Sequence, residues 1–470
     1  MEDVMQEDIT TTESGQSERT ADLLRLVEHV PTPTREYRAR RKARQATLEP
    51  GVPKMPAIPL PKPPAGARVL IWKQDPTVAE IGIRKAFLSG HVLAGPRDAR
   101  LTVQGVSPVS PNAMGDLIET PGTEAFDAVH TFAVVRETLT MYQRALGAPL
   151  PWQWNSPTVT DPLHVHPHAG ETMNAYYSRG ERALKFFWFH KPSAPSTVIF
   201  TCRSLDIVAH EAGHAILDGL KPGWLGFGNP PQTGGLHESF GDLTAIFLAL
   251  SQLDQVEAVI AQTKANLHDK TFLSDLAEEF GLALGRPNGL RNADNDLKLS
   301  QVGTEVHAIS QVFTGGIYDV LADLFAFERR PKVRDDAAVL YEVAAYLRSL
   351  LLRAIAAAPA TAATFADVVN GMLTIAAADG KPVQYRNFIR NRFTLREVVV
   401  SPTPFTQDHQ AGLGLAPGVT DEAGASQNRV GCCGTMQLAE YDGAQPALDE
   451  ELRDLVEALR RRAGEARRAS

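Results

Sequence analysis

Two histidines that lie four residues apart, with a glutamate after the first, are the strongest chemical signal in this sequence. They are His210, Glu211 and His214, in the segment 206–214, DIVAHEAGH. On an α-helix, residues i and i+4 lie on the same face, so both imidazoles can bind one cation. Glu211 projects about 100° around the helix from His210, where it can take a proton from a water molecule beside that cation. The spacing predicts a metal site with its own general base.

A helix over this segment has a start signal and an apolar side. Asp206 lies where an N-cap would accept hydrogen bonds from the free amides of the first turn. Ile207, Val208, Ile216 and Leu217 give the helix an apolar side that can pack in a core. The metal ligands would therefore stand on a rigid element.

Two acidic residues downstream repeat the same spacing. Glu238 and Asp242 lie in the segment 234–242, GGLHESFGD, on a run 238–250 that is expected to be a buried helix. A catalytic zinc has three protein ligands and one open position. Glu238 would be the third ligand, and Asp242 can accept the free ring N–H of a ligand histidine. This second motif favours a metal site over the alternative, two unrelated histidines on a solvated helix.

Together, the two motifs resemble the thermolysin-like metallopeptidases, the gluzincins, whose zinc is held by two histidines and a glutamate. The resemblance covers roughly residues 127–324. It implies an α+β fold with a strand-rich N-terminal lobe, a mainly helical C-terminal lobe and the zinc helix at the base of the cleft. It also implies Zn²⁺ as the cofactor and a peptide or protein as the substrate.

Three further segments are similar to the family and suggest substrate-binding and catalytic residues. Asn174 and Ala175, in the segment 174–177, NAYY, resemble the edge strand that pairs with an extended substrate. In the segment 306–310, VHAIS, His307 would correspond to the family's transition-state histidine. Arg291, in LRNAD, would correspond to its substrate-binding arginine.

The sequence also departs from the family pattern. No tyrosine lies in the stretch 215–237, where the family has an oxyanion donor, and Trp224 is the only indole there. The acid that would orient His307 falls at Val302, which leaves Glu305 as the nearest substitute. The helix after Glu238 lacks the acidic residues that bind calcium in the family.

Composition and charge bear on the class of protein. The chain has 470 residues, 43% hydrophobic and 22% charged, which suggests two or three domains. Its net charge of −8 argues against nucleic-acid binding as the main function. Its three cysteines cannot form a disulfide framework, which indicates a reducing compartment. Cys202 is expected to be a small core residue.

No signal peptide and no uninterrupted apolar run of about 18 residues can be read from the sequence. We therefore expect a cytoplasmic protein that acts on a peptide or protein and binds neither nucleic acid nor membrane, with non-classical export or delivery as an alternative. The oligomeric state stays open.

The chain is expected to divide into four regions. Residues 1–66 are expected to form a disordered, basic and proline-rich tail, with a short possible helix at 20–29. Residues 67–204 are expected to form a strand-rich lobe with one long helix, 126–146. Residues 205–400 carry the zinc helices and a helical lobe, and 401–470 a glycine-rich linker and an amphipathic helix, 448–463. The strands are expected at 68–74, 183–189 and 197–201, and the later helices at 255–266, 270–284, 307–327, 335–356, 365–378 and 384–392.

Other histidines offer weaker metal signals. The segment 164–168, HVHPH, puts two histidines on one side of a strand, but no carboxylate or thiolate nearby completes a set. A histidine-bearing loop at the rim of the cleft is the preferred interpretation. His237 is expected to be a hydrogen-bonded packing residue.

These residues predict a zinc-dependent endopeptidase. Zinc held by His210, His214 and Glu238 would activate a water, Glu211 would move its proton to the leaving amine, and His307 would stabilise the oxyanion. Two alternatives stay open. One is a zinc-binding pseudoenzyme or scaffold without turnover, and the other is a delivered effector or toxin that uses the same chemistry.

Overall fold

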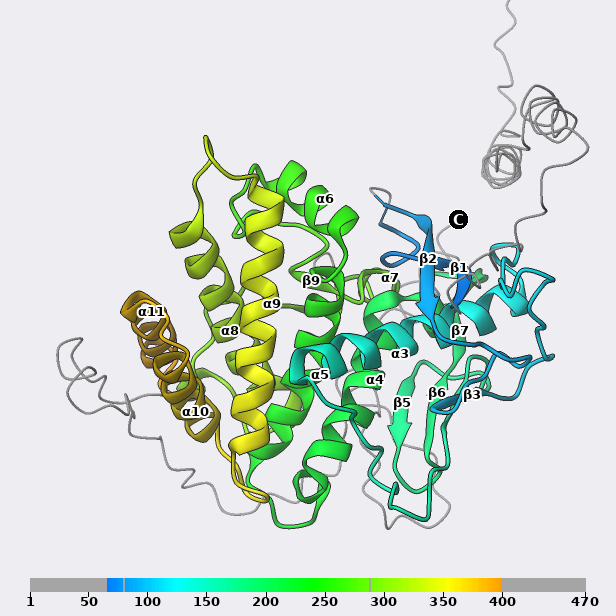
Figure 1. The fold of residues 1–470 in the computed structure, drawn as a ribbon, viewed down its shortest axis with the longest axis horizontal. Coiled ribbons are helices and arrows are strands. Elements are labelled where there is room, and N and C mark those ends of the chain that lie inside the picture. Colours follow the sequence, from blue (N-terminus) through cyan, green and yellow to red (C-terminus); the bar gives the residue numbers. More distant parts are fainter. Residues whose placement is uncertain (1–65, 79–80, 287–288, 399–470) are drawn as a thin grey trace, which may run out of the picture. The chain divides into compact units, whose positions relative to one another are not determined.

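The computed structural model describes residues 66–78, 81–286 and 289–398. The chain divides into two units, Met1–Ala65 and Gly66–Ser470, and the described residues all lie in the second. The expected helices 20–29 and 448–463 and the glycine-rich linker lie outside the described residues. Within them, helices and strands are mixed, which agrees with an α+β fold (Figure 1).

Short strands dominate the first half of this unit. The strands of the largest sheet run in the order β3-β4-β6-β5, which puts β5 at one edge. In this sheet β3 is parallel to β4 and β4 to β6, whereas β5 is antiparallel to β6. The four strands are β3 (Leu101–Val103), β4 (Leu163–His166), β5 (Ala175–Ser178) and β6 (Ala183–Phe186).

Two antiparallel pairs accompany this sheet. β1 (Gly66–Trp72) pairs with β2 (Ile83–Ser89), and β7 (Trp188–Lys191) pairs with β8 (Ala194–Phe200). The strand expected at 183–189 is thus two strands, β6 and β7, because the chain changes sheet between residues 186 and 188.

The long helix α3 (Glu124–Leu146) lies close to the 126–146 range expected from the sequence. Thr123 caps its start by accepting a hydrogen bond from the Phe126 amide, and Gly147 ends it with a φ of 72°. Glycine suits that position because a left-handed residue with a Cβ is strained. The helix contacts β1, β3 and α4 (Leu205–Leu220), so it joins the strands to the helices.

The predicted zinc motifs lie on two helices that pack against each other. The first motif lies on α4 and the second on α5 (Pro231–Ala249). The cap of α4 is Ser204, whose hydroxyl accepts from the Ile207 amide at 3.2 Å, so the prediction that Asp206 is the N-cap was wrong. Asp206 lies inside the first turn of α4 and accepts from the Ala277 amide at 3.4 Å.

The helical half continues with α8 (Val306–Glu328), which packs along α5 on the other side from α4 (Figure 1). The other helices expected in this half occur within a few residues of their expected bounds. They are α6 (Leu253–Thr263), α9 (Asp336–Ala357), α10 (Phe365–Ala378) and α11 (Val383–Leu395).

The segment 270–284 is not the single helix that was expected. It contains a short strand, β9 (Asp275–Leu276), and only then a helix, α7 (Glu278–Ala283). Ala277 between them has a left-handed φ of 51°, which no continuous helix allows. The strand forms because β9 pairs with β10 (Arg291–Asn292), a contact that a local apolar pattern does not encode.

One hydrophobic core connects both halves of the described unit. It includes Phe132 on α3, Leu184 on β6, Ile216 on α4, Phe247 on α5 and Leu350 on α9, each with at most 1% of its surface exposed. Such a core holds the metal-site helices against the sheet.

Among the described helices, none by itself combines the length and hydropathy that a membrane crossing requires. Helices α5 and α6 reach the required length and hydropathy only when they are counted together, and they meet at a 93° bend.

Candidate metal centre

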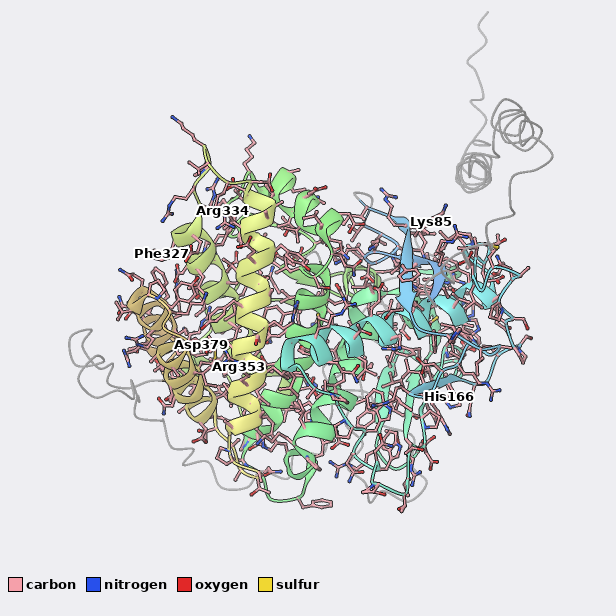
Figure 2. The ribbon with its side chains drawn as sticks, viewed as in Figure 1. Lys85, His166, Phe327, Arg334, Arg353 and Asp379 are labelled. Atoms are coloured by element: carbon pink, nitrogen blue, oxygen red, sulfur yellow. The ribbon has the colours of Figure 1, made fainter. Side chains whose placement is uncertain are left out.

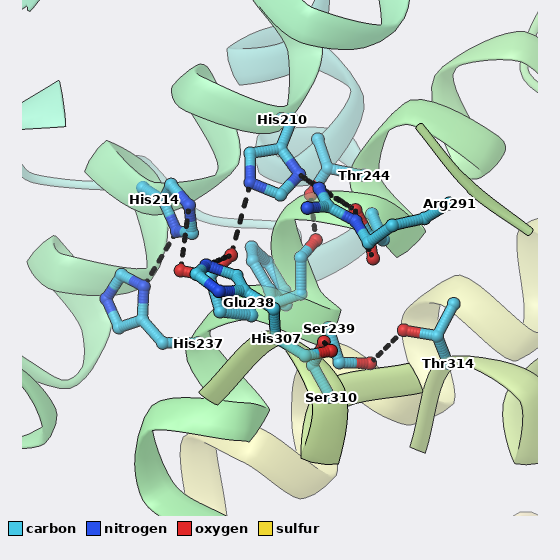
Figure 3. A network of polar contacts seen from close by, with 12 residues as sticks. His210, His214, His237, Glu238, Ser239, Thr244, Arg291, His307, Ser310 and Thr314 are labelled. Atoms are coloured by element: carbon cyan, nitrogen blue, oxygen red, sulfur yellow. Dashed lines mark hydrogen bonds and ion pairs between the residues drawn. The ribbon is translucent and has the colours of Figure 1, made fainter. Parts of the chain in front are cut away.

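The three predicted metal ligands meet between α4 and α5. Ligand atoms of His210, His214 and Glu238 all lie within 4.8 Å of one another. Glu238 Oε2 is 3.6 Å from His210 Nε2, and Glu238 Oε1 is 3.7 Å from His214 Nε2 (Figure 3). Two donors bound to one tetrahedral zinc ion lie roughly 3.3 Å apart. These separations are close to that spacing and long for direct hydrogen bonds.

The burial of this group makes a cation the natural partner. His214 and Glu238 are fully buried. Within the described part of the chain, His214 Nε2 and both Glu238 carboxylate oxygens have no hydrogen-bond partner. A buried carboxylate without a compensating partner is costly, so these atoms fit a site for a positive ion. Two imidazoles and one carboxylate are a zinc-type donor set.

The protonation states also suit metal binding. Burial lowers the pKa of His214 well below its usual value, so its imidazole is neutral. Burial raises the pKa of Glu238, but electrostatic interactions with the His214, His307 and His210 rings outweigh it, and the net pKa is well below the usual range. A neutral imidazole and an ionised carboxylate are the forms that bind metals.

Two glycines allow the helices to come close enough. A Cβ on Gly213 would lie 2.7 Å from Thr244 Oγ1, and a Cβ on Gly241 would lie 2.6 Å from His210 Cε1. Real Cβ contacts are not that short, so side chains here would push α4 and α5 apart or displace the His210 ring. The glycines inside both motifs therefore have a packing role beside the ligands.

Asp242 lies where the sequence places it, next to the first histidine. Its Oδ1 is 3.0 Å from His210 Nδ1. Arg291, brought in by β10, donates to Asp242 Oδ1 at 2.7 Å and to Oδ2 at 3.1 Å. Burial raises the pKa of Asp242, but Arg291 and His210 outweigh it, so the net pKa is lowered and the carboxylate is ionised. If His210 binds a cation through Nε2, its Nδ1–H donates to this carboxylate.

His237 is a buried, hydrogen-bonded residue, as expected, and its partner, which the sequence did not indicate, is the second histidine. Its Nδ1 is 2.8 Å from His214 Nδ1, and the two rings stack with centroids 4.9 Å apart (Figure 3). When His214 Nε2 faces a cation, its Nδ1 carries the hydrogen, so His237 Nδ1 must accept. Burial lowers the pKa of His237 to about 3, which keeps it neutral and able to accept. The signal in the sequence was its position one residue before Glu238.

Replacing His237 is expected to weaken metal binding without removing a ligand. In His237→Ala, His214 loses the partner that orients its ring, and the loss of such a partner typically costs about 10- to 100-fold in metal affinity. His237→Asn should retain more affinity, because a side-chain amide oxygen can accept the same hydrogen. Competition with a zinc chelator measures both variants. Equal affinities in His237→Ala and the unchanged protein would show that this contact only fills space.

Glu211 lies next to the ligands and faces a small cavity. It is 1% exposed, and it lines a cavity of about 30 Å³ together with His210 and Ala175. That volume is enough to hold water. Burial raises the pKa of Glu211 to about 8. A cation bound nearby would lower that pKa again, which would return Glu211 to the ionised form that a general base needs.

His307 reaches the same centre from the start of α8. Its Nε2 is 3.6 Å from Glu238 Oε2 (Figure 3), and its Nδ1 forms an ion pair with Glu305. Glu305 is also the N-cap of α8 and accepts from the amides of His307 at 3.0 Å and Ala308 at 2.8 Å. Burial raises the pKa of Glu305, but these contacts outweigh it and lower the net pKa. Glu305 thus occupies the position beside His307 that the sequence suggested for it.

The predicted substrate strand is at the edge of its sheet. Asn174 directly precedes β5, and its side-chain oxygen accepts from the Ala175 amide at 2.9 Å. All four residues of β5 are buried, and Ala175 lines the small cavity beside Glu211. The structure thus brings Ala175 to the metal centre, and pairing with a substrate stays a prediction.

Trp224 does not replace the missing tyrosine. It is 2% exposed, and its indole N–H donates to the backbone oxygen of Pro359 at 2.9 Å. Tyr177 is also engaged, since its hydroxyl donates to Asp218 at 2.6 Å. Neither group is thus available to a substrate in this arrangement.

Two other groups of possible metal donors each include a carboxylate that already pairs with arginine. Arg203 donates to both oxygens of Asp127 at 2.8 Å, and Arg396 donates to Asp319 at 3.0 Å. A guanidinium in this position neutralises the carboxylate that a cation would need. The groups are Asp127, His168 and Cys202, and His268, Asp294 and Asp319. Cys202 itself is buried in the core, as expected.

Comparison with known proteins leaves the family open. No protein-family model matches the chain, and no curated protein matches it. Among solved structures, it is similar to the precursor of protealysin, a metalloproteinase from Serratia proteamaculans. The identity is 15% and the TM-score 0.39, over 63% of this chain and 86% of that one. A similarity at this level carries no conclusion about fold or activity, and any function assigned to this chain rests on the geometry of the site.

Proposed function

We propose that this protein is a zinc-dependent endopeptidase with a thermolysin-like site. The observation that carries the proposal is the meeting of three elements at one buried point. Helix α4 brings two histidines and Glu211, helix α5 brings Glu238, and helix α8 brings His307. This combination of donors, base and a third imidazole suits metal-assisted hydrolysis.

His210, His214 and Glu238 would hold the zinc ion. Bound there, zinc would polarise a scissile carbonyl and make a nearby water more acidic. Glu211 would accept the proton of that water and transfer it to the nitrogen of the leaving amine. Its burial next to a cavity that can hold water supports this assignment.

His307 would act on the substrate oxygen. Its pairing with Glu305 favours the cationic imidazolium, which can donate through Nε2 to a developing oxyanion. Asn174 and Ala175 would hold the substrate backbone, and Arg291 would hold a substrate carbonyl while Asp242 keeps its guanidinium in place.

Apolar side chains form part of the lining of the small cavity, beside Asp206 and Arg291. Ile207, Leu276, Phe280 and Leu290 line it. We therefore expect the peptide residue that lies against these side chains to be apolar, because burying a charge there would cost several kcal/mol.

His307→Ala is expected to lower kcat by roughly 10² while zinc content stays unchanged, because an oxyanion donor acts mainly in the transition state. Glu305→Gln should give a smaller loss of kcat, since the ring remains but its cationic form is less favoured. Both kinetic constants, zinc content and melting temperature check this prediction. If His307→Ala lowers the melting temperature but leaves kcat unchanged, then His307 only stabilises the N-terminus of α8.

A cleavage profile tests the proposed function. The zinc-loaded protein is incubated with a mixed peptide library, beside the same protein stripped by a chelator and beside Glu211→Gln. We expect new amino termini only with the loaded, unchanged protein. If zinc binds in a one-to-one ratio and no peptide bond is cut, the site belongs to a zinc-binding scaffold, an alternative that the absence of a tyrosine between residues 215 and 237 favours.

A further inference from the structure

A second cavity shares no lining residue with the metal centre. It has a volume of about 260 Å³ and is bounded by β2, α3, α9 and the turn that connects α5 to α6. Its lining includes three arginines, one glutamate and two aromatic rings. These are Phe87 on β2, Arg136, Glu137 and Arg144 on α3, and Tyr341 and Arg348 on α9.

Arg348 is a partly buried charge in this cavity with few hydrogen bonds of its own. Its side chain is partly buried, and its Nε is fully buried without a hydrogen-bond partner among residues 66–398 that the structure describes. Its Nη1 donates to the Phe247 backbone oxygen, but at 3.5 Å this contact is weak. Burial lowers the pKa of Arg348, as expected for a cation taken from water without an anion beside it. Nη2 makes no hydrogen bond within the described ranges and is not among the fully buried atoms, so it is the guanidinium nitrogen that can donate to an anionic ligand in the cavity.

The remaining charges leave an excess of positive charge in the cavity. Arg136 is neutralised by Asp98, whose Oδ2 is 2.7 Å from Arg136 Nε. Neither Arg144 nor Arg348 lies within ion-pair distance of a carboxylate in the described ranges. Glu137 has one buried oxygen without a hydrogen-bond partner there. Burial raises the pKa of Glu137 to about 7, so its carboxyl group can also donate a hydrogen bond near neutral pH.

Two aromatic rings at the cavity indicate the shape of the ligand. Phe87 is 56% exposed and Tyr341 is 39% exposed. Both rings line the cavity, where they can contact an apolar part of a ligand. Rings and guanidinium planes both stack on flat groups. With a volume of about 260 Å³, the cavity has room for a small organic molecule.

We propose that this cavity binds a small organic carboxylate with a flat apolar body. Arg348 receives the carboxylate, Arg144 adds positive charge at the mouth, and Phe87 and Tyr341 contact the flat body. The site is independent of the proposed peptidase function, because none of its residues belongs to the metal centre.

Calorimetric titration of the full chain tests the proposal, with benzoate as the probe. Benzamide is the matched control ligand, because it has the same shape and no charge. We expect benzoate to bind at least about 10-fold more tightly than benzamide, since hydrogen bonds between charged groups are stronger than neutral ones. Because benzoate can also bind zinc, the titration is repeated after zinc is removed, and the same affinity is expected.

Variants locate the site. Arg348→Gln is expected to weaken benzoate binding roughly 10-fold or more. Arg353→Gln is the matched control: this arginine is on the same helix but pairs with Asp379 outside the cavity (Figure 2), and its loss should leave benzoate binding within about two-fold.

A second variant keeps the test decisive if Arg348→Gln does not fold. Tyr341→Ala changes an exposed ring and is expected to weaken benzoate binding several-fold with an unchanged melting temperature. The proposal is overturned if benzamide binds as tightly as benzoate, or if neither Arg348→Gln nor Tyr341→Ala changes the affinity. Inorganic phosphate that binds as tightly as benzoate would also overturn it, because phosphate has no apolar body.

Discussion

Glu211→Gln is expected to keep the fold and the zinc while peptide hydrolysis falls by about 10² to 10⁴. Glutamine has nearly the same shape as glutamate, so the packing around this buried position is preserved. Its amide cannot accept the proton of the attacking water. The proposed mechanism assigns no other base, since Asp242, which also lines the cavity, is already paired with His210 and Arg291. The loss should fall on kcat, because the general base acts in the chemical step.

The measurement compares kcat, zinc content and melting temperature for the best peptide from the library. Glu257→Gln is the matched control, because the same change on the exposed side of α6 removes one negative charge without touching the site. A Glu211→Gln protein with nearly normal kcat would place the base elsewhere and remove the main reason for the proposed chemistry.

His210→Ala and Glu238→Ala are each expected to release the zinc and with it all metal-dependent activity. Each substitution removes one of three ligands, so the affinity should fall by more than the roughly 10- to 100-fold that the loss of an outer partner costs. Glu238→Ala also removes the only carboxylate of the proposed ligand set, and two neutral imidazoles hold a dication less well than three ligands that include an anion.

Zinc content after gel filtration, measured by elemental analysis, checks this prediction. His190→Ala is the control, because it removes an exposed histidine on β7. Unchanged zinc in both ligand variants would refute the ligand set. Loss of zinc with an unchanged melting temperature would show that the core holds the helices together without the metal.

Much of the site could be predicted because its chemistry is local. The positions of His210, Glu211 and His214 relative to one another follow from the geometry of a helix, whatever the helix packs against. Helices such as α8, α9 and α10 were predicted nearly to their bounds, because their apolar residues recur at helical spacing over many turns.

The predictions that were wrong depended on competition between local and distant partners. Asp206 and Ser204 are both good N-cap residues, and only the path of the chain decides which of them starts α4. The segment 270–284 has an apolar pattern that a helix can use. Its residues Asp275 and Leu276 instead pair with β10, and this pairing carries Arg291 to Asp242.

What the sequence determined by itself is the set of donors: which residues on α4 and α5 can bind a cation and which residue can act as base. Tertiary structure alone decided which side chains contact and orient those donors, because each of these contacts joins residues that are far apart in the chain. His237 meets His214 only because Gly213 and Gly241 let α4 and α5 approach closely. His307 reaches Glu238 only because α8 packs along α5. Helix geometry acts within a few residues, whereas the approach of two helices depends on all the side chains between them.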